Sequence, residues 1–219
     1  MYHAMKRFLD LTLALLALLC FWPLLLLITV MIKVDAKGPV IFKQRRVGRS
    51  KQEFNIYKFR TMRGDTPCDM PTHMMNNPEA YITKFGKFLR KSSLDEVPQI
   101  FNIIKGEMSI IGPRPALWNQ YDLVGERDKY GVNAIRPGLT GWAQINGRDE
   151  LPIPVKVEYD RYYMEHQSLR LDLKIFIKTI TNVLRAKGVV EGSQAEEPAE
   201  VQSVAKVVQS GKQGLHPTR

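Results

Sequence analysis

The feature that most constrains this chain is the uncharged apolar run from Leu11 to Ile32, which contains Pro23 near its middle. As a straight helix the run would be about 33 Å long, enough to span the hydrocarbon core of a bilayer. The rest of the chain is polar, basic and too rich in charge to be embedded in a membrane. The sequence therefore predicts a soluble domain that is attached to a membrane through an apolar helix.

Pro23 and the flanking charges leave two interpretations of this helix open. Proline removes a backbone donor and its ring clashes with the carbonyl four residues earlier, so we expect a kink. Basic residues flank the run on both sides, and basic flanks are typical of the cytoplasmic side. A re-entrant helix that bends at Pro23 satisfies this rule at both ends, whereas an ordinary single span with a tolerated proline does not. A secretory signal peptide fits poorly, because the run is long and no A-x-A-like site follows it. The flanking basic residues are Lys6, Arg7, Lys33, Lys37, Lys43, Arg45 and Arg46.

The net charge of +10 indicates an anionic partner. A basic domain can bind nucleic acid, anionic lipid or a phosphorylated substrate, and the apolar run favours the last two. The cysteines, Cys20 and Cys68, exclude a disulfide framework and a cysteine-based zinc site, and they fit a reducing compartment. The length fits one domain plus an anchor, and the residues from 189 onward have little core potential.

Beyond the apolar run, hydrophobic periodicity predicts an α+β fold that is mostly helical with a small antiparallel β-hairpin. The hairpin is expected over residues 40–62, and the apolar stretch before Gly112 reads as a strand. The last predicted helix is basic and amphipathic, so it lies either on a membrane surface or against the core. The predicted helices cover residues 81–91, a stretch that begins near Leu94 or Asp95, and residues 121–130, 155–167 and 171–187.

Asp95-Glu96 is the first candidate for a chemical site, since the sequence has no P-loop, dinucleotide-binding or zinc-protease motif. One alternative is structural: Ser93-x-x-Glu96 matches a capping box, and acids stabilise the first turn of a helix. The other is chemical, because carboxylates bind Mg²⁺ and can attack phosphorus. Adjacent helical residues point about 100° apart, so the two carboxylates can have different roles.

The second candidate is the arginine in Gly112-Pro113-Arg114-Pro115. Proline on both sides stiffens the backbone, so the guanidinium loses less freedom when it binds a phosphate. The alternative is a tight turn with an exposed arginine. Arg136 and Arg148 also lie in stiff or glycine-rich loops. Together with Lys58 and Arg60, these arginines carry enough charge to hold a diphosphate.

Several blocks of the sequence together resemble the bacterial sugar transferase family, the monotopic polyprenyl-phosphate phosphoglycosyl transferases. They are KRFLDLTLALL, GPVIFKQRRVG, IYKFRTM, LRKSSLDEVPQIFNIIKGEMSIIGPRP, RPGLTGWAQINGR and LDLKIFIKT. The resemblance implies a re-entrant membrane helix over residues 1–37 with both ends in the cytoplasm and a catalytic domain over 38–188. The composition of residues 189–219, which take no part in the resemblance, predicts a mobile tail. Where the family has Ser-Pro at the helix break, this chain has Trp22-Pro23, which lacks the hydroxyl.

The resemblance also implies a reaction: transfer of a sugar 1-phosphate from a UDP-sugar to polyprenyl (undecaprenyl) phosphate, with release of UMP. The reaction would take place at the cytoplasmic face of the bacterial inner membrane, as the first membrane step of glycoconjugate synthesis. Asp95 matches the family's nucleophile, Glu96 the second member of the dyad, and Mg²⁺ would bind Asp95 and the phosphates. Arg114 matches the phosphate clamp. Supporting cations are expected at Lys58, Arg60, Arg90, Arg136 and Arg148.

Two other functions are compatible with an anchored basic chain. One is a non-catalytic protein that binds anionic lipid or nucleic acid, which would need neither the carboxylate pair nor the stiff arginines. Aromatic residues interleaved with basic ones would favour nucleic acid, and only IYKFR hints at this pattern, so we expect no nucleic-acid partner. The other is a transferase that uses a preformed lipid-linked sugar. The sequence leaves open the sugar, the glycan pathway and a homo-oligomer.

Overall fold

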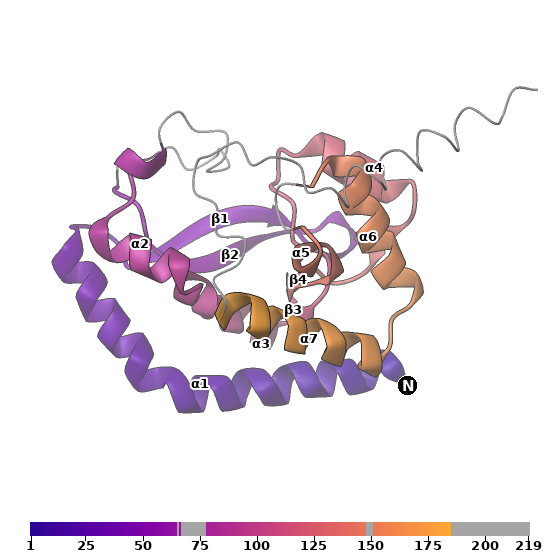
Figure 1. The fold of residues 1–219 in the computed structure, drawn as a ribbon, viewed down its shortest axis with the longest axis horizontal. Coiled ribbons are helices and arrows are strands. Elements are labelled where there is room, and N and C mark those ends of the chain that lie inside the picture. Colours follow the sequence, from indigo (N-terminus) through magenta and orange to yellow (C-terminus); the bar gives the residue numbers. More distant parts are fainter. Residues whose placement is uncertain (65, 67–77, 148–150, 185–219) are drawn as a thin grey trace, which may run out of the picture.

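The computed structural model describes residues 1–64, 66, 78–147 and 151–184. The long N-terminal helix lies along one edge of the molecule, and the other elements form a domain against it (Figure 1). The α-helices are α1 (Tyr2–Asp35), α2 (Lys84–Lys91), α3 (Ile100–Lys105), α4 (Tyr121–Asp128), α5 (Trp142–Ile145), α6 (Ile153–Glu165) and α7 (Leu169–Leu184). The strands are β1 (Ile41–Val47), β2 (Glu53–Phe59), β3 (Ser109–Ile111) and β4 (Gly138–Thr140). Short 3₁₀ helices are η1 (Arg49–Lys51), η3 (Pro78–Ala80), η4 (Leu94–Gln99) and η5 (Val132–Ala134).

The predicted mostly helical fold with a small antiparallel hairpin is confirmed. Strands β1 and β2 pair antiparallel, from Ile41 opposite Phe59 to Val47 opposite Glu53. A second pair, β3 with β4, is parallel, and the sequence analysis missed it. Strand β4 is too short to show an alternating pattern, and the glycines around it indicate turns. The predicted tail from residue 189 and most of the loop at 64–79 lie outside the described residues.

The helix predicted from Leu94 or Asp95 is two elements in the structure. The segment starts as the 3₁₀ helix η4, which contains Pro98, and becomes the α-helix α3 at Ile100. Pro98 has no N–H to donate within a helix, and a short 3₁₀ turn accommodates this at little cost. Gly106, with φ of 86°, ends α3 in the left-handed conformation. The carboxylate pair therefore lies on a short turn and not on a long helix.

Two apolar clusters attach α1 to the domain. Ala14 of α1 packs with Ile56 of β2 and with Ile103 of α3. Further along, Ile28 of α1 packs with Phe59 of β2, in a cluster that also contains a residue of α2. Strand β2, which carries Lys58, and helix α3, which directly follows the segment of the carboxylate pair, thus both pack against α1.

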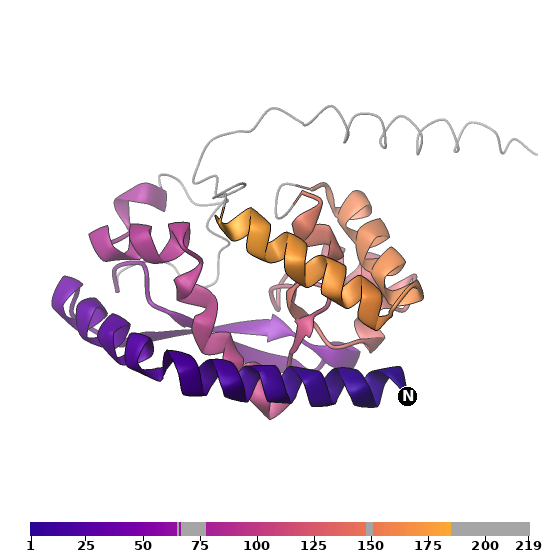
Figure 2. The same cartoon turned by 60° about the horizontal axis from the view of Figure 1, so that its bottom comes forward.

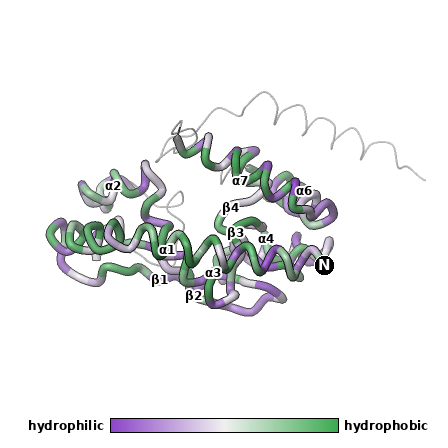
Figure 3. The backbone as a smooth tube through the Cα atoms, turned by 90° about the horizontal axis from the view of Figure 1, so that it is seen from below, coloured by the Kyte–Doolittle hydropathy of each residue, from purple (hydrophilic) through white to green (hydrophobic). Residues whose placement is uncertain are grey.

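Helix α1 is long and apolar enough to cross a membrane, judged by length and composition alone. It changes direction partway along its length (Figures 1 and 2), and Pro23 lies inside it. Its buried residues are Asp10, Ala14, Ile28 and Ile32. Most of α1 consists of hydrophobic residues (Figure 3). Exposed apolar side chains on it include Phe8, Leu13, Leu16, Leu19, Trp22, Leu26, Leu27 and Val30.

Polar contacts fix the first part of α1 to the domain. Arg7 donates to the carbonyls of Ile103 and Ile104 at the end of α3, over 2.6 and 3.0 Å. Asp10 is buried, and its carboxylate accepts a hydrogen bond from the backbone N–H of Ile110. These contacts satisfy helix-end carbonyls and a buried charge, so they are costly to break.

Polar contacts also fix the end of α1. The guanidinium of Arg60 is buried and donates to the carbonyls of Ala36 and Lys37, over 2.5 and 2.7 Å. Asp35 accepts a hydrogen bond from the backbone N–H of Phe85 in α2. Both ends of α1 therefore contact the same domain.

The parallel pair β3–β4 depends on close contact between glycines. A Cβ on Gly141 would lie 2.1 Å from the carbonyl oxygen of Gly112, and a Cβ on Gly138 would lie 2.1 Å from the nitrogen of Gly112. Both neighbours are backbone atoms, so a side chain at either position would push the two segments apart. The glycine spacing in the loop at 135–148 thus serves tight backbone packing beside Arg114.

Replacing Gly141 by Ala is therefore expected to destabilise the protein by about 1–3 kcal/mol through overpacking. Gly125 of α4 is the matched control, because a Cβ there meets nothing within 4 Å. Gly125→Ala should stabilise by about 0.5–1 kcal/mol, since glycine is unfavourable inside a helix. Thermal or chemical unfolding of the two variants checks both signs. Equal stability of the two variants would refute the close-packing argument.

Candidate active site

The carboxylate pair lies on η4 and does not form the capping box that the sequence allowed. Ser93 has φ of 58° and its side chain makes no capping hydrogen bond. An N-cap residue normally has extended backbone, which lets its hydroxyl reach the first turn, and the left-handed conformation prevents this. The capping-box interpretation of Ser93 and Glu96 is therefore wrong. Glu96 contacts cations instead.

Two cations from separate elements meet on Glu96. Lys58 of β2 donates to Oε1 of Glu96 over 2.7 Å, and Nη2 of Arg114 donates to the same oxygen over 3.1 Å. All three side chains are largely buried. The structure therefore brings together four residues that the sequence analysis selected: Asp95, Glu96, Lys58 and Arg114.

The two carboxylates of the pair are electrostatically different. Burial by itself raises the pKa of Glu96, but the charges and hydrogen bonds of Lys58 and Arg114 outweigh it and hold that pKa below its usual range. Burial is also the largest influence on Asp95, and it raises the pKa of that carboxyl above its usual range. The positive charge of Lys58 opposes this rise in pKa, and the negative charge of Glu96 adds to it. Asp95 is therefore the more basic carboxylate, and the two cations favour the ionised form of Glu96.

Arg90 of α2 belongs to the same electrostatic environment. Its Nε donates to Oγ1 of Thr61 over 3.0 Å. The guanidinium lies close enough to Asp95 to lower the pKa of that carboxyl, together with Lys58 and Arg114. The predicted supporting cation at this position is thus near the carboxylate pair.

Arg60 and Arg136 make other contacts. Arg60 binds the carbonyls that end α1, and Nε of Arg136 donates to the carbonyl of Gly106 at the end of α3. Burial and the nearby charges of Arg49 and Arg7 lower the pKa of Arg136. Helix ends leave carbonyls that attract arginine, and a count of cations in the sequence cannot distinguish this use from phosphate binding. In the structure both guanidiniums hold a helix end, so we infer structural roles for them. Their predicted binding of phosphate stays a prediction, and Arg148 lies outside the described residues.

The backbone around Arg114 is fixed by the parallel strands. The N–H of Gly112 donates to the carbonyl of Thr140, and the N–H of Gly138 donates to the carbonyl of Pro113. Proline on both sides of Arg114 further limits its backbone. The Arg114 side chain therefore projects from a rigid turn, as the sequence predicted.

Sequence reasoning missed two buried residues behind this turn, Arg127 of α4 and Asp160 of α6. They form an ion pair in which Nη2 of Arg127 lies 2.6 Å from Oδ2 of Asp160. Arg127 also donates to the carbonyl of Arg114 over 3.0 Å. The available signal was weak: Asp160 is three residues from Val157 and from Tyr163, which are both buried, so it shares their face of α6.

The carboxylate pair can supply part of a magnesium site. Among the described residues, no group of three or more His, Cys, Asp or Glu side chains could hold a metal by itself. Mg²⁺ in phosphoryl-transfer enzymes usually binds one or two carboxylates and completes its shell with water and substrate phosphates. Asp95 and its neighbour fit that requirement.

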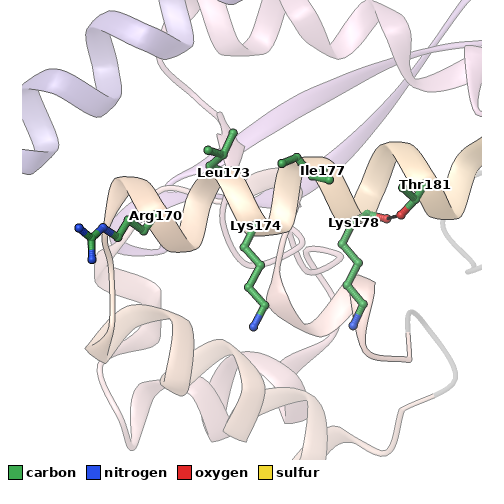
Figure 4. Close-up of a pocket in the computed structure, with 6 residues that line it drawn as sticks. All are labelled: Arg170, Leu173, Lys174, Ile177, Lys178 and Thr181. Atoms are coloured by element: carbon green, nitrogen blue, oxygen red, sulfur yellow. Dashed lines mark hydrogen bonds between the residues drawn. The ribbon is translucent and has the colours of Figure 1, made fainter.

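An open groove of about 510 Å³ runs along α7 and is separate from the carboxylate pair (Figure 4). Leu173 and Ile177 point to one side of the helix, and Lys174 and Lys178 to the other. Ile175 is buried in the core. Much of the apolar side of α7 is thus exposed, whereas Ile175 packs in the core. Exposed apolar residues of α7 are Leu169, Leu173, Phe176, Ile177 and Ile180.

Comparison with known proteins identifies the class to which this fold and site belong. A family model described as "Bacterial sugar transferase" matches residues 1–186, and the chain belongs to this family. A UDP-glucose:undecaprenyl-phosphate glucose-1-phosphate transferase of Xanthomonas campestris pv. campestris is 42% identical over 189 residues, covering 83% of this chain and 39% of that protein. The sugar transferase EpsL of Bacillus subtilis is 38% identical over 84% of this chain and 90% of its own length.

A third relative is a UDP-N-acetylgalactosamine-undecaprenyl-phosphate N-acetylgalactosaminephosphotransferase of Aeromonas hydrophila. It is 38% identical over 85% of this chain and 45% of that protein. The chain thus spans less than half the length of the Xanthomonas and Aeromonas relatives and nearly all of EpsL.

Proposed function

We propose that this protein transfers a sugar 1-phosphate from a UDP-sugar to polyprenyl phosphate and releases UMP. The observation that carries the proposal is a basic carboxylate, Asp95, beside a second carboxylate that holds two cations from different elements. Phosphoryl transfer needs positioning and positive charge more than elaborate acid–base groups. Relatives named as transferases for UDP-glucose and UDP-N-acetylgalactosamine support the same chemistry. The family and this site do not support the non-catalytic alternative.

In the first step, a carboxylate oxygen of Asp95 attacks the β-phosphorus of the UDP-sugar. The bond between that phosphorus and the oxygen of UMP breaks, and UMP leaves with the electron pair. The sugar phosphate is then held on Asp95 as an acyl phosphate. The raised pKa favours this role, because a more basic carboxylate is a stronger nucleophile once it is ionised.

In the second step, a phosphate oxygen of polyprenyl phosphate attacks the same phosphorus. The bond to Asp95 breaks, the carboxylate is regenerated, and the product is a polyprenyl diphosphate sugar. The acceptor phosphate has a second pKa of about 6, so it is largely ionised at neutral pH and needs no general base. Glu96 is a weak base because of its two ion pairs, and we assign it the role of holding Lys58 and Arg114 in place.

We also propose that Mg²⁺ binds to Asp95 and the donor diphosphate. The ion would supply positive charge to the phosphate oxygens during transfer. Arg114 and Lys58 would bind the remaining phosphate oxygens, with Arg90 contributing charge from α2.

For the membrane, we propose that α1 is re-entrant and keeps both ends in the cytoplasm of a bacterium. Arg7 and Arg60 fix the two ends of the helix to the same domain, so a straight span would have to break one set of these contacts. Between Ala14 and Ile28 one side of α1 packs on the domain, whereas Leu19, Trp22 and Leu26 are exposed and can enter lipid. The exposed apolar stripe of α7, with lysines beside it, would lie on the membrane surface.

Replacing Pro23 by Leu is expected to straighten α1 and favour a full span, because leucine restores the missing backbone donor. The position of the N-terminus can be read by labelling a His3→Cys variant in a background without Cys20 and Cys68. With Pro23 the cysteine should be labelled only from the cytoplasm, and with Leu at this position a fraction should become accessible from outside. Labelling only from the cytoplasm in both proteins would count against the kink.

The function is tested by a UMP-release assay on the purified protein in nanodiscs, with Mg²⁺, undecaprenyl phosphate and a series of UDP-sugars. We expect UMP from at least one UDP-sugar and a labelled polyprenyl diphosphate sugar in the lipid phase. A transferase that used a preformed lipid-linked sugar would form product without UMP release. That result would overturn the proposal.

A further inference from the structure

We propose that Arg127, held by Asp160, is a positioning residue for Arg114. This inference rests on the proposed function, because it assigns the pair to the phosphate clamp. The contacts form a continuous chain from α6 to the carboxylate pair: Asp160 binds Arg127, Arg127 binds the backbone of Arg114, and Arg114 binds Glu96.

The first link is the buried ion pair. Arg127 and Asp160 are 4% and 1% exposed. Nε and Nη2 of Arg127 both donate to Oδ2 of Asp160, over 3.0 and 2.6 Å. This leaves Nη1 to donate to the carbonyl of Arg114 over 3.0 Å. Buried ion pairs add little net stability compared with well-packed apolar residues. Stability alone therefore does not explain why an ion pair lies behind the Arg114 turn.

The second link is the turn that carries Arg114, in which consecutive backbone carbonyls each accept a hydrogen bond. Gly138 donates to the carbonyl of Pro113, and the backbone N–H of Val47 donates to that of Ala116. Arg46 donates to the carbonyl of Pro115, and Arg127 to that of Arg114. The carbonyl of Arg114 thus accepts a hydrogen bond from a side chain of α4. The carbonyls on either side of it accept from residues of β4 and β1. Such a contact fixes the peptide plane from which the clamp side chain projects.

The third link is α6, which supports the turn at two points. Asp160 acts on Arg114 through Arg127, and the hydroxyl of Tyr163, one helical turn later, lies 3.3 Å from the carbonyl oxygen of Ile111. The Tyr163 hydroxyl donates to Asp172 over 2.8 Å, and Asp172 also accepts from Tyr2 and Lys6 of α1. The helix that positions the clamp is thereby connected to the membrane helix.

The test replaces the ion pair by apolar residues of similar size, Arg127→Met with Asp160→Leu, because this exchange can preserve stability. Affinity for UDP with Mg²⁺ is measured by calorimetry on the full-length protein in detergent, and Tm is measured in parallel. We expect Kd for UDP to rise about tenfold from misplacement of the clamp, with little change in Tm. Arg161→Met removes a guanidinium from the exposed face of α6 and should leave Kd unchanged.

Non-additivity separates positioning from a general structural effect. Arg114→Ala should weaken UDP binding strongly in the wild-type background and much less in the double variant, because the clamp is already misplaced there. Arg127→Lys serves as a second variant if the double variant does not fold. It keeps a positive charge opposite Asp160 but lacks the guanidinium nitrogen that donates to the carbonyl of Arg114. It should show the same non-additivity.

Two results would overturn the inference: an unchanged Kd in a folded variant, or losses that multiply independently with Arg114→Ala. If wild-type protein with Mg²⁺ does not bind UDP at all, the proposed function fails together with it. Normal wild-type binding that is insensitive to Arg127 refutes the positioning role alone.

Discussion

Asp95→Asn should abolish UMP release from a UDP-sugar, with a loss of at least about 10³-fold, as for removal of other catalytic nucleophiles. The amide has the size and shape of the carboxylate but cannot form the acyl phosphate. The loss should appear in kcat, because the variant keeps Lys58, Arg114 and Glu96 for substrate binding. Turnover is measured by UMP release in nanodiscs with Mg²⁺ and undecaprenyl phosphate.

Glu96→Gln is the informative comparison for this result. It removes the charge that holds Lys58 and Arg114 but leaves the nucleophile in place. We expect a partial loss of activity and a weaker affinity for the donor. Wild-type turnover by Asp95→Asn would show that the nucleophile is wrongly assigned. Complete loss in Glu96→Gln with activity retained in Asp95→Asn would exchange the two roles.

Arg114→Lys should lower kcat/KM for the UDP-sugar about 10²-fold, the usual range for loss of an oriented donor to developing charge. Lysine keeps the positive charge but cannot bind Glu96 and a phosphate with separate nitrogens in a fixed plane. Steady-state kinetics of the variant at saturating acceptor measures the effect.

Arg136→Lys is the matched control, because Arg136, like Arg114, directly precedes a proline but contacts the end of α3. It should lower thermal stability and leave kcat/KM of the folded protein nearly unchanged. Equal kinetic losses at Arg114 and Arg136 would place both in the site and contradict the structural role assigned to Arg136.

The elements that carry periodic patterns were predictable from the sequence. The hairpin β1–β2 has β-branched and aromatic runs on either side of a glycine-containing turn, and α6 and α7 are long stretches with helical spacing. The split at Pro98 and the strand β4 were not predictable, because each involves only a few residues and is determined by contacts distant in sequence. Pro23 and the basic flanks suggested the re-entrant interpretation of α1, and the family resemblance favoured it. It stays a proposal, for which the contacts at both ends of α1 are an argument.

The candidate site was predictable where function requires a distinctive local sequence. Asp95-Glu96 and the Pro-Arg-Pro turn are such sequences, and the structure brings them together with Lys58. The roles of the other cations depend on which helix-end carbonyls lie near them in space, and the sequence alone does not show this. Arg60 therefore looked like a phosphate ligand but contacts the end of α1. Arg127 looked like one more charge on a polar helix but is buried behind Arg114.

We propose that the sugar phosphate is transferred through a covalent bond to Asp95. The most direct test mixes the protein with its UDP-sugar and Mg²⁺ in the absence of polyprenyl phosphate. We predict a burst of UMP in a one-to-one ratio to protein, a mass increase equal to one sugar phosphate on the peptide that contains Asp95, and loss of this mass when undecaprenyl phosphate is added. Release of UMP only when both substrates are present, with no mass increase on the protein, would contradict the covalent mechanism.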